Sequence, residues 1–270
     1  MTITLVDNTP TTEETTSYTF QKKCFKMAGL VWVFYSNGTY FGYKTSKDNF
    51  GAFTSLFSCS AGFWVCMLYD PVNNIIYYVR QAATSSRTVY YRWGTPNSDG
   101  TITWSIAESS LTVSTILASP LTSGCSRLYL SKDASGNLYL TMNYLDYTSD
   151  LGSQYWIRVF KYSAGTWTEL TGAQVSYGSY IPCGGVIPLT GSKLALIHGT
   201  VNGLTVLKVR TSGDSGSTWS ADISSVGKPY LQNGSWTSLG VAVYVVGSKN
   251  SSTDWTPRLY KFTYGGSAWT

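Results

Sequence analysis

Short runs of hydrophobic and aromatic residues recur along the whole chain, and turn residues separate them. Residues 31–35 are rich in β-branched and aromatic side chains, and residues 204–209 alternate between hydrophobic and polar, as is typical of strands. No segment keeps a helical period over about twelve residues. Turn sequences fall between the runs, at 36–39, 70–74, 134–137 and 201–203. The pattern therefore predicts an all-β protein.

The strand pattern repeats along the chain, and an aromatic residue closes each copy. The copies recur every ~50 residues, and such a period with several short strands per unit predicts propeller blades. We expect one domain over residues 1–270, a β-propeller with five blades of about four antiparallel strands each. The closing aromatic residues are Phe53, Trp104, Trp167, Trp219 and Trp269. The expected blades span residues 18–59, 60–112, 123–178, 180–228 and 230–270.

The fullest copy contains the sequence SGDSGSTWS at 212–220. It matches the pattern S-x-D-x-G-x-T-W at Ser212, Asp214, Gly216, Thr218 and Trp219. Weaker matches occur at Asp99, Thr103 and Trp104, and at Asp48, Gly51 and Phe53. Through these motifs the chain resembles the Asp-box (BNR) propellers, which are sialidase-like. The resemblance implies that the box residues are structural and lie on the face away from any ligand.

Physical chemistry accounts for these residue types in a tight hairpin loop. An aspartate carboxylate accepts backbone N–H bonds across the loop. Glycine adopts positive φ at little cost, and tryptophan buries a large apolar area. We therefore expect Asp48, Asp99 and Asp214 to stabilise the fold.

The ends of the chain suggest how a ring could close. Residues 2–6, TITLV, form a strand-like run with no partner in its own repeat, and residues 7–17 form a polar linker. The last repeat reaches Thr270 where its outermost strand would begin. Because an open strand edge favours further pairing, we expect residues 2–6 to supply the outer strand of the last blade. The alternative is that the chain is a fragment and the ring is larger or open.

Composition narrows the functional classes. Charged residues make up 12% of the chain and aromatic residues 15%, which is unlike a disordered protein. The net charge of +5 comes without a dense run of Lys and Arg, so we expect no specific nucleic-acid partner. No window approaches the ~18 apolar residues of a membrane helix, so we expect no membrane span.

The surface chemistry indicates a location outside the cell. Ser, Thr, Asn, Gly and Tyr are abundant, and N-x-S/T sequons begin at Asn37, Asn233 and Asn250. The N-terminus shows no leader pattern. We expect an extracellular or virion-surface protein, with a cytoplasmic location left open.

Cysteine and histidine give little sign of a metal or cofactor. The five cysteines contain no C-x-x-C pair. We interpret them as small buried residues and expect neither metal nor cofactor. The single histidine, His198, is interpreted as a hydrogen-bonded polar group.

Catalytic residues are not evident. A sialidase-like site would need an arginine cluster, a Tyr–Glu pair and an acidic Asp, as the resemblance implies. An arabinanase-like site would need two or three carboxylates near the axis. Arg127 is the only arginine on an expected innermost strand, while Glu108, Glu169 and Asp222 fall on outer strands. We expect no catalytic residues, and glycoside hydrolysis of either kind stays as the alternative.

Two long loops and the segments between blades suggest a binding surface. The loops at 143–155 and 247–258 are the longest connections between second and third strands. Aromatic rings beside carboxylates suit carbohydrate, because rings stack on sugar faces and carboxylates accept from hydroxyls. Tyr177 and Tyr180 lie in a segment between blades. The predicted ligand-binding residues are Asp146, Tyr147, Asp150, Tyr230, Trp236, Asp254 and Trp255.

The sequence thus predicts a non-enzymatic recognition propeller that binds glycans or a glycosylated cell surface. A virion or phage surface is one setting, and a homo-oligomer or larger particle would supply many copies. The second alternative is a structural assembly subunit with no ligand.

Overall fold

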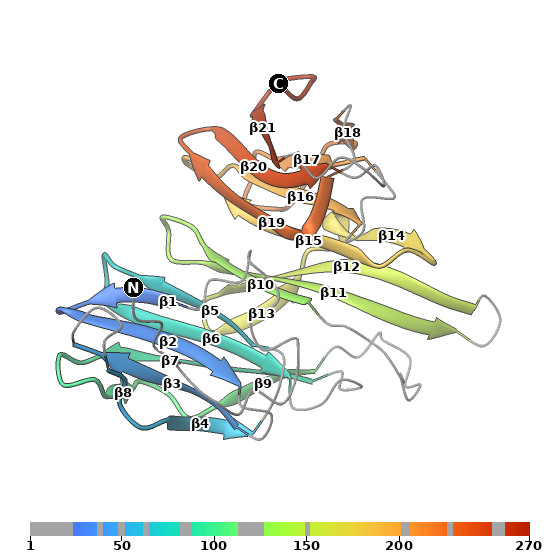
Figure 1. Ribbon diagram of the computed structural model, residues 1–270. Helices are drawn as coiled ribbons and strands as arrows, with labels where there is room; N and C mark the ends of the chain where they lie inside the picture. The colour runs from blue at the N-terminus through green and yellow to red at the C-terminus, as the bar shows by residue number, and fades with distance from the viewer. Residues whose placement is uncertain are drawn as a thin grey trace. The chain divides into compact units, whose positions relative to one another are not determined.

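The computed structural model describes most of the chain, and β-structure dominates it (Figure 1). The strands form five antiparallel sheets, which we name A to E in chain order. Within the described ranges there is one 3-10 turn, η2 (Thr171–Ala173), no α-helix, and no helix able to span a membrane. The described residues are 24–36, 40–47, 52–61, 65–81, 88–112, 127–148, 152–200, 206–225, 229–249 and 257–270.

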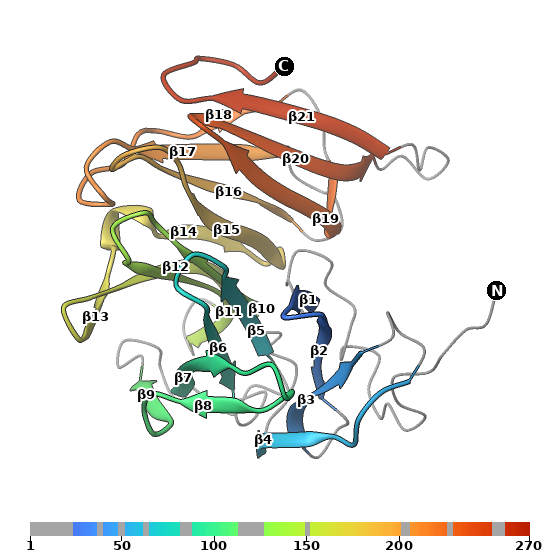
Figure 2. The same cartoon turned by 90° about the vertical axis from the view of Figure 1, so that its left-hand side faces the viewer.

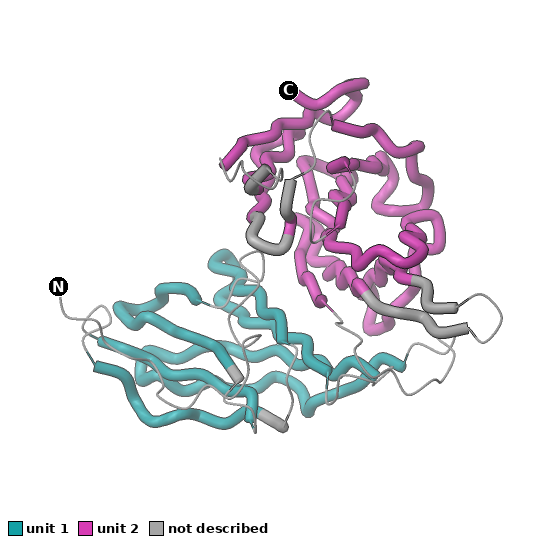
Figure 3. Tube along the Cα trace, turned by 45° about the vertical axis from the view of Figure 1, so that its right-hand side comes forward, with its two compact units in different colours: residues 1–17, 21–116 teal, residues 18–20, 117–270 magenta. Residues whose placement is uncertain are grey.

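The chain divides into two compact units (Figure 3). Unit 1 comprises residues 1–17 and 21–116, and unit 2 comprises residues 18–20 and 117–270. Sheets A and B belong to unit 1, and sheets C, D and E belong to unit 2.

Unit 1 holds two sheets around an aromatic core. The Phe41 and Tyr78 rings meet edge to face at 5.1 Å, which joins sheet A to sheet B. Trp32 and Phe34 are fully buried beside them. Sheet A has the order β1 (Cys24–Met27), β2 (Leu30–Ser36), β3 (Tyr40–Ser46), β4 (Phe57–Ala61). Sheet B has β5 (Val65–Asp70), β6 (Ile75–Gln81), β7 (Thr88–Pro96), β8 (Ile102–Trp104), with β9 (Ser109–Thr112) also pairing with β7.

Unit 2 contains three sheets, each built of consecutive strands; those of sheet E lie side by side in Figure 2. Sheet C has β10 (Arg127–Lys132), β11 (Leu138–Thr148), β12 (Gly152–Ser163), β13 (Thr166–Glu169), with β14 (Val175–Gly178) also on β12. Sheet D has β15 (Pro182–Pro188), β16 (Leu194–Thr200), β17 (Lys208–Ser212), β18 (Ile223–Ser224). Sheet E has β19 (Pro229–Leu239), β20 (Ala242–Lys249), β21 (Pro257–Thr263).

The first strand of sheet D packs between its neighbours. The buried Ser131 hydroxyl donates to the Val186 carbonyl at 2.6 Å, which ties β10 to β15. A Cβ added at Gly185 would lie 2.5 Å from the Tyr129 ring, so glycine permits this close approach. Cys183 and Cys66 are buried on such first strands, as expected, whereas Cys24 is exposed.

The repeats share one backbone register, and the closing aromatic residue of the third repeat holds the expected position. The residue after the closing aromatic donates to the third strand: Ser105 to Trp93, and Ser220 to Thr211. In sheet C Trp167 pairs with Tyr162, which pairs with Leu138 at the start of β11, just as Ser212 pairs with Leu194 at the start of β16. Trp167 therefore lies at the closing position.

The expected closing strand at residues 2–6 lies outside the described residues, so its pairing stays a prediction. Sheet E shows three strands within the described part of the chain. If residues 2–6 pair with its outer edge, deletion of residues 1–6 removes a ladder and should lower the melting temperature. Thermal unfolding followed by circular dichroism measures this, and an unchanged melting temperature would contradict the closure.

Candidate functional site

Three of the sequence-predicted ligand residues, Asp146, Tyr147 and Tyr230, lie toward one end of the sheets of unit 2. At this end the second strand of each sheet leads into the third, through residues 149–151, 201–207 and 250–256; we call it the loop end. The Asn143 side chain donates to the Gly184 carbonyl at 3.2 Å, which joins sheets C and D, and the Cys183 thiol reaches the Leu231 carbonyl at 3.7 Å, which joins sheets D and E near this end. At the opposite end the Ser238 hydroxyl donates to the Pro188 carbonyl at 3.0 Å.

The predicted long loop at 143–155 is mostly strand, which corrects the sequence interpretation. β11 continues to Thr148 and β12 begins at Gly152, with these two residues paired (Figure 1). Because the ladder continues beyond the rest of the sheet, the loop is an extended hairpin. Asp146 and Tyr147 lie on this extension.

The remaining predicted ligand residues divide into two groups. Tyr230 pairs with Ser248 at the loop end of sheet E. Asp150, Asp254 and Trp255 lie outside the described residues. The roles of all these side chains stay predictions.

Trp236 is a core residue and not an accessible ring. It is 4% exposed, and its ring centroid lies 5.4 Å from that of Tyr129 on β10. A ring packed between two sheets cannot stack on a sugar, so Trp236 is not a ligand-binding residue. The pattern of hydrophobic and polar residues along β19 did not show which side chains face the core.

Tyr180 is the accessible aromatic residue that the sequence indicated only in passing. It is 47% exposed, and its backbone N–H donates to the Tyr177 carbonyl at 3.1 Å. β14 precedes it and pairs with β12, with Gly178 opposite Tyr155. Since β14 runs antiparallel to β12, the chain beyond Gly178 continues toward the extended hairpin. Tyr180 therefore lies at the loop end.

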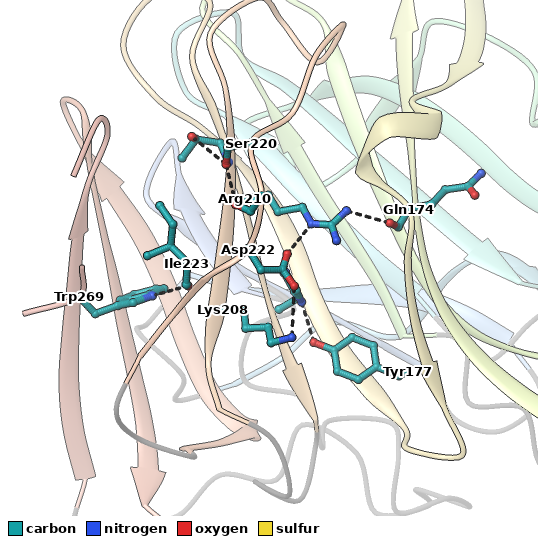
Figure 4. Close-up of polar contacts among 11 residues, drawn as sticks. Gln174, Tyr177, Lys208, Arg210, Ser220, Asp222, Ile223 and Trp269 are labelled. Carbon is teal, nitrogen blue, oxygen red and sulfur yellow. Dashed lines mark hydrogen bonds and ion pairs between the residues drawn. The ribbon is translucent and has the colours of Figure 1, made fainter. Parts of the chain in front are cut away.

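A network of polar side chains joins sheets C and D (Figure 4). His198 on β16 is fully buried. Its Nδ1 lies 2.6 Å from the Tyr177 hydroxyl, and its Nε2 lies 3.2 Å from Asp222 Oδ1. Burial lowers the pKa of His198, partly offset by Asp222, so the imidazole is neutral at pH 7.

Asp222 gathers three cationic or polar partners on sheet D. Lys208 Nζ lies 3.2 Å from Oδ2, and Arg210 Nε donates to Oδ1. Burial by itself would raise the pKa of the Asp222 carboxyl, but hydrogen bonds from His198 and Arg210 hold it well below its usual range. Arg210 also donates through Nη1 to the Gln174 carbonyl at 3.0 Å. Arg210 therefore links the third strand of sheet D to sheet C.

Sequence reasoning missed that an arginine–carboxylate contact also occurs in sheet C. Arg158 on β12 pairs with Glu169 at 3.3 Å, and Gln174 Nε2 donates to Glu169 at 2.8 Å. Arg158 lies two residues farther from the hairpin turn than the position that Arg210 occupies in sheet D, where sheet C has Phe160. The available signal was an arginine on the third strand of successive repeats.

Sheet B contains a related cluster in unit 1. Arg80 pairs with Glu108 through two contacts, from Nε to Oε1 and from Nη2 to Oε2. The Tyr78 hydroxyl donates to Glu108 at 2.7 Å. Arg92 donates to the Ile106 carbonyl and stacks over Trp104. Here the carboxylate of Glu108 holds one arginine and one tyrosine, both on β6.

The carboxylates whose side chains are described all accept hydrogen bonds from the protein. Asp70 and Asp133 accept within the first hairpins of sheets B and C, for example from Asn137 N at 2.8 Å to Asp133. In the described part of the chain no group of three or more His, Cys, Asp or Glu could hold a metal. These carboxylates are Asp70, Asp99, Glu108, Asp133, Glu169, Asp214 and Asp222.

The loop at 212–219 lies at the end of sheet D opposite to the loop end. Asp214 accepts from the Ser212 hydroxyl at 2.8 Å, the Thr218 N–H at 2.9 Å and the Thr218 hydroxyl at 2.7 Å. Trp219 Nε1 donates to the Gly216 carbonyl at 3.0 Å. The hydrogen bonds from Thr218 and Ser212 hold the pKa of Asp214 down to about 2. The Asp214 carboxylate therefore bonds to residues on both sides of the loop.

The other two expected box loops differ in detail. Asp99 accepts from the N–H and hydroxyl of Thr101, whereas Thr103 receives a bond from Asn97. Asp48 lies outside the described residues. The Thr of the second motif is therefore displaced by two positions.

Comparison with known proteins gives a fold and no family. No protein-family model matches the chain, and no curated protein matches it. Among solved structures, an ulvan lyase from a new polysaccharide lyase family aligns with a TM-score of 0.50 and 16% identity over 91% of this chain. The endosialidase of phage phi92 aligns at 0.50 and 11% over 98%, and the Dos1 propeller at 0.51 and 10% over 88%.

This chain spans 64%, 58% and 54% of those three proteins, respectively. At these identities the similarity establishes architecture alone. Together with the five consecutive antiparallel sheets, it shows that the chain has an all-β, β-propeller fold.

Proposed function

We propose that the loop end of unit 2 is a carbohydrate-recognition surface and that the protein is a non-enzymatic binding propeller. The observation that carries this proposal is Tyr180, a ring 47% exposed at the loop end beside the hairpin that bears Asp146 and Tyr147. An exposed aromatic ring near short polar groups suits the alternating apolar and hydroxyl faces of a sugar.

The hydrogen bonds that the described carboxylates make within the protein fit a binding role better than a role in hydrolysis. A glycosidase needs two carboxyl groups free to act as acid and as base or nucleophile. The seven described carboxylates are committed to hydrogen bonds within the sheets and turns. Two proteins that share the fold are a polysaccharide lyase and an endosialidase. Because fold alone does not determine function, we use that similarity only for the ligand class.

The loop at 212–219 supports assignment to the Asp-box, sialidase-like propellers, with its box on the face away from the ligand. A single shallow sugar site binds weakly, so many copies would be needed for useful avidity. We therefore propose an extracellular or virion-surface location, with the protein in a homo-oligomer or larger particle.

Tyr180→Ala should weaken binding to the glycans that the parent protein recognises on a glycan array. An aromatic anchor contributes about 1–3 kcal/mol, so we expect affinity to fall between about fivefold and 150-fold. Isothermal titration with the best array glycan measures the change. Tyr147→Ala and Trp255→Ala test the two hairpins in the same way.

Leu239→Ala is the control, since Leu239 is 73% exposed in unit 2 but lies at the β19–β20 hairpin, opposite to the loop end. It should leave binding unchanged. If folded Tyr180, Tyr147 and Trp255 variants all bind like the parent, the loop end is not the site. Turnover of fluorogenic glycosides would instead favour a hydrolase, and an array with no bound glycan would favour an assembly subunit.

A further inference from the structure

One buried chain of polar groups has no part in the proposed binding surface. It runs from Tyr177 on β14 through His198 on β16 to Asp222, and joins sheet C to sheet D. His198 is the single histidine of the protein and is fully buried. Histidine is the side chain whose unperturbed pKa places its change of charge near neutral pH.

The hydrogen bonds define which imidazole nitrogen carries the proton. Asp222 is ionised and can only accept, so His198 Nε2 donates to it across 3.2 Å. Nδ1 of the neutral ring is then an acceptor, and the Tyr177 hydroxyl donates to it across 2.6 Å. In this arrangement the Tyr177 hydroxyl and both ring nitrogens of His198 each have a hydrogen-bond partner.

The groups that face His198 make a second proton costly. Tyr177 approaches from β14, Cys183 lies on β15, Lys208 and Arg210 extend from β17, and Asp222 follows the 212–219 loop. On β19 the nearby described side chain is the apolar Leu231. An imidazolium would therefore share one carboxylate with Lys208 and Arg210.

Protonation would also remove the contact to Tyr177. The added proton binds Nδ1, which is the atom that accepts from the Tyr177 hydroxyl. Nδ1 would become a donor, and the hydroxyl hydrogen would lose its acceptor in a buried site. Leaving a buried donor without a partner is unfavourable.

Tyr177 anchors a short element. β14 pairs with β12 through three residue pairs, and Tyr177 is its buried aromatic side chain. We propose that the Tyr177–His198–Asp222 chain is a pH-sensitive latch, which fixes β14 and the following Tyr180 at neutral pH and releases them on acidification. The latch goes beyond the proposed function and does not depend on what Tyr180 binds.

The direction of the effect follows from linkage. The folded-state pKa of His198 lies below its ordinary value of 6.5. The released or unfolded form therefore takes up the proton first, and the latched form loses stability as the pH falls below that value.

NMR of protein with isotope-labelled histidine tests the chemistry, since it reports one imidazole. We expect the Nε2–H form at pH 7. Hydrogen exchange of residues 175–180, followed by mass spectrometry, tests the release. Exchange corrected for its intrinsic pH dependence should rise at least tenfold between pH 7 and pH 4.5, while that of residues 194–200 should change little.

Two variants separate the latch from general acid instability. Tyr177→Phe removes only the hydroxyl and should show fast exchange in residues 175–180 already at pH 7. His198→Gln cannot titrate, so its exchange should not depend on pH. An Nδ1–H form at pH 7, corrected exchange in the parent that is independent of pH, or an acid response retained by folded His198→Gln would each overturn the proposal. Should His198→Gln not fold, slow exchange in Tyr177→Phe at pH 7 would also overturn it.

Discussion

Gly216→Ala should lower the free energy of unfolding by about 2–4 kcal/mol. Gly216 has a φ of +96°, a conformation that L-residues adopt only with strain. A Cβ at this position would lie 2.5 Å from Leu170 Cδ1. The substitution therefore adds backbone strain to overpacking where the 212–219 loop meets sheet C. Urea unfolding followed by circular dichroism measures the loss.

Gly165→Ala is the control for the backbone part of this loss. Gly165 also lies in unit 2 and has a φ of +87°, but no atom lies within 4 Å of an added Cβ. Its replacement should cost only about 1–2 kcal/mol, the strain of a left-handed conformation. Equal losses for the two variants would show that Leu170 moves aside and that the close packing is not stabilising.

The fold class could be predicted from the sequence because each repeat carries its own local signals. Turn sequences and β-branched runs indicated about four consecutive antiparallel strands per repeat, and the all-β propeller is confirmed. The closing aromatic residues were also predictable. The Ser163–Thr166 hairpin is tighter than the 212–219 loop, yet Trp167 still lies opposite the third-strand residue that pairs with the start of β11.

The candidate site was less accessible to sequence reasoning. Residues 143–155 contain Ser, Asp and Gly, which resemble a loop, yet cross-strand pairing extends the hairpin to Thr148. Tyr180 and Trp236 are both aromatic residues near sheet junctions, and only packing shows that one is exposed and the other buried. Side-chain burial depends on contacts between sheets, which a single sequence does not contain.

The cation–carboxylate clusters explain why polar outer strands keep the sheets together. Arg210 reaches from sheet D to the Gln174 carbonyl, and Gln174 in turn donates to Glu169. This connection complements the apolar cluster around Ile157 and Leu196, which joins the same two sheets. Removing Asp222, the carboxylate that Arg210 donates to, should therefore destabilise both sheets.

Asp222→Ala should lower the free energy of unfolding at pH 7 by about 3 kcal/mol. It leaves Arg210, Lys208 and the His198 Nε2–H without their shared acceptor. Breaking a buried ion pair costs about 3–5 kcal/mol, and we expect the lower end because the Asp222 side chain is 21% exposed. Urea unfolding at pH 7 measures the change.

The pH dependence and a double variant identify the source of this loss. The pKa of Asp222 is depressed in the folded state, so its contribution is present above the unfolded value of 3.8 and is lost as the pH falls below it. The difference between parent and variant should shrink accordingly in acid. Lys208→Ala combined with Asp222→Ala should cost less than the sum of the single changes, because both remove one interaction. Strict additivity, with a difference independent of pH, would mean that the carboxylate stabilises the sheets by packing and not by charge.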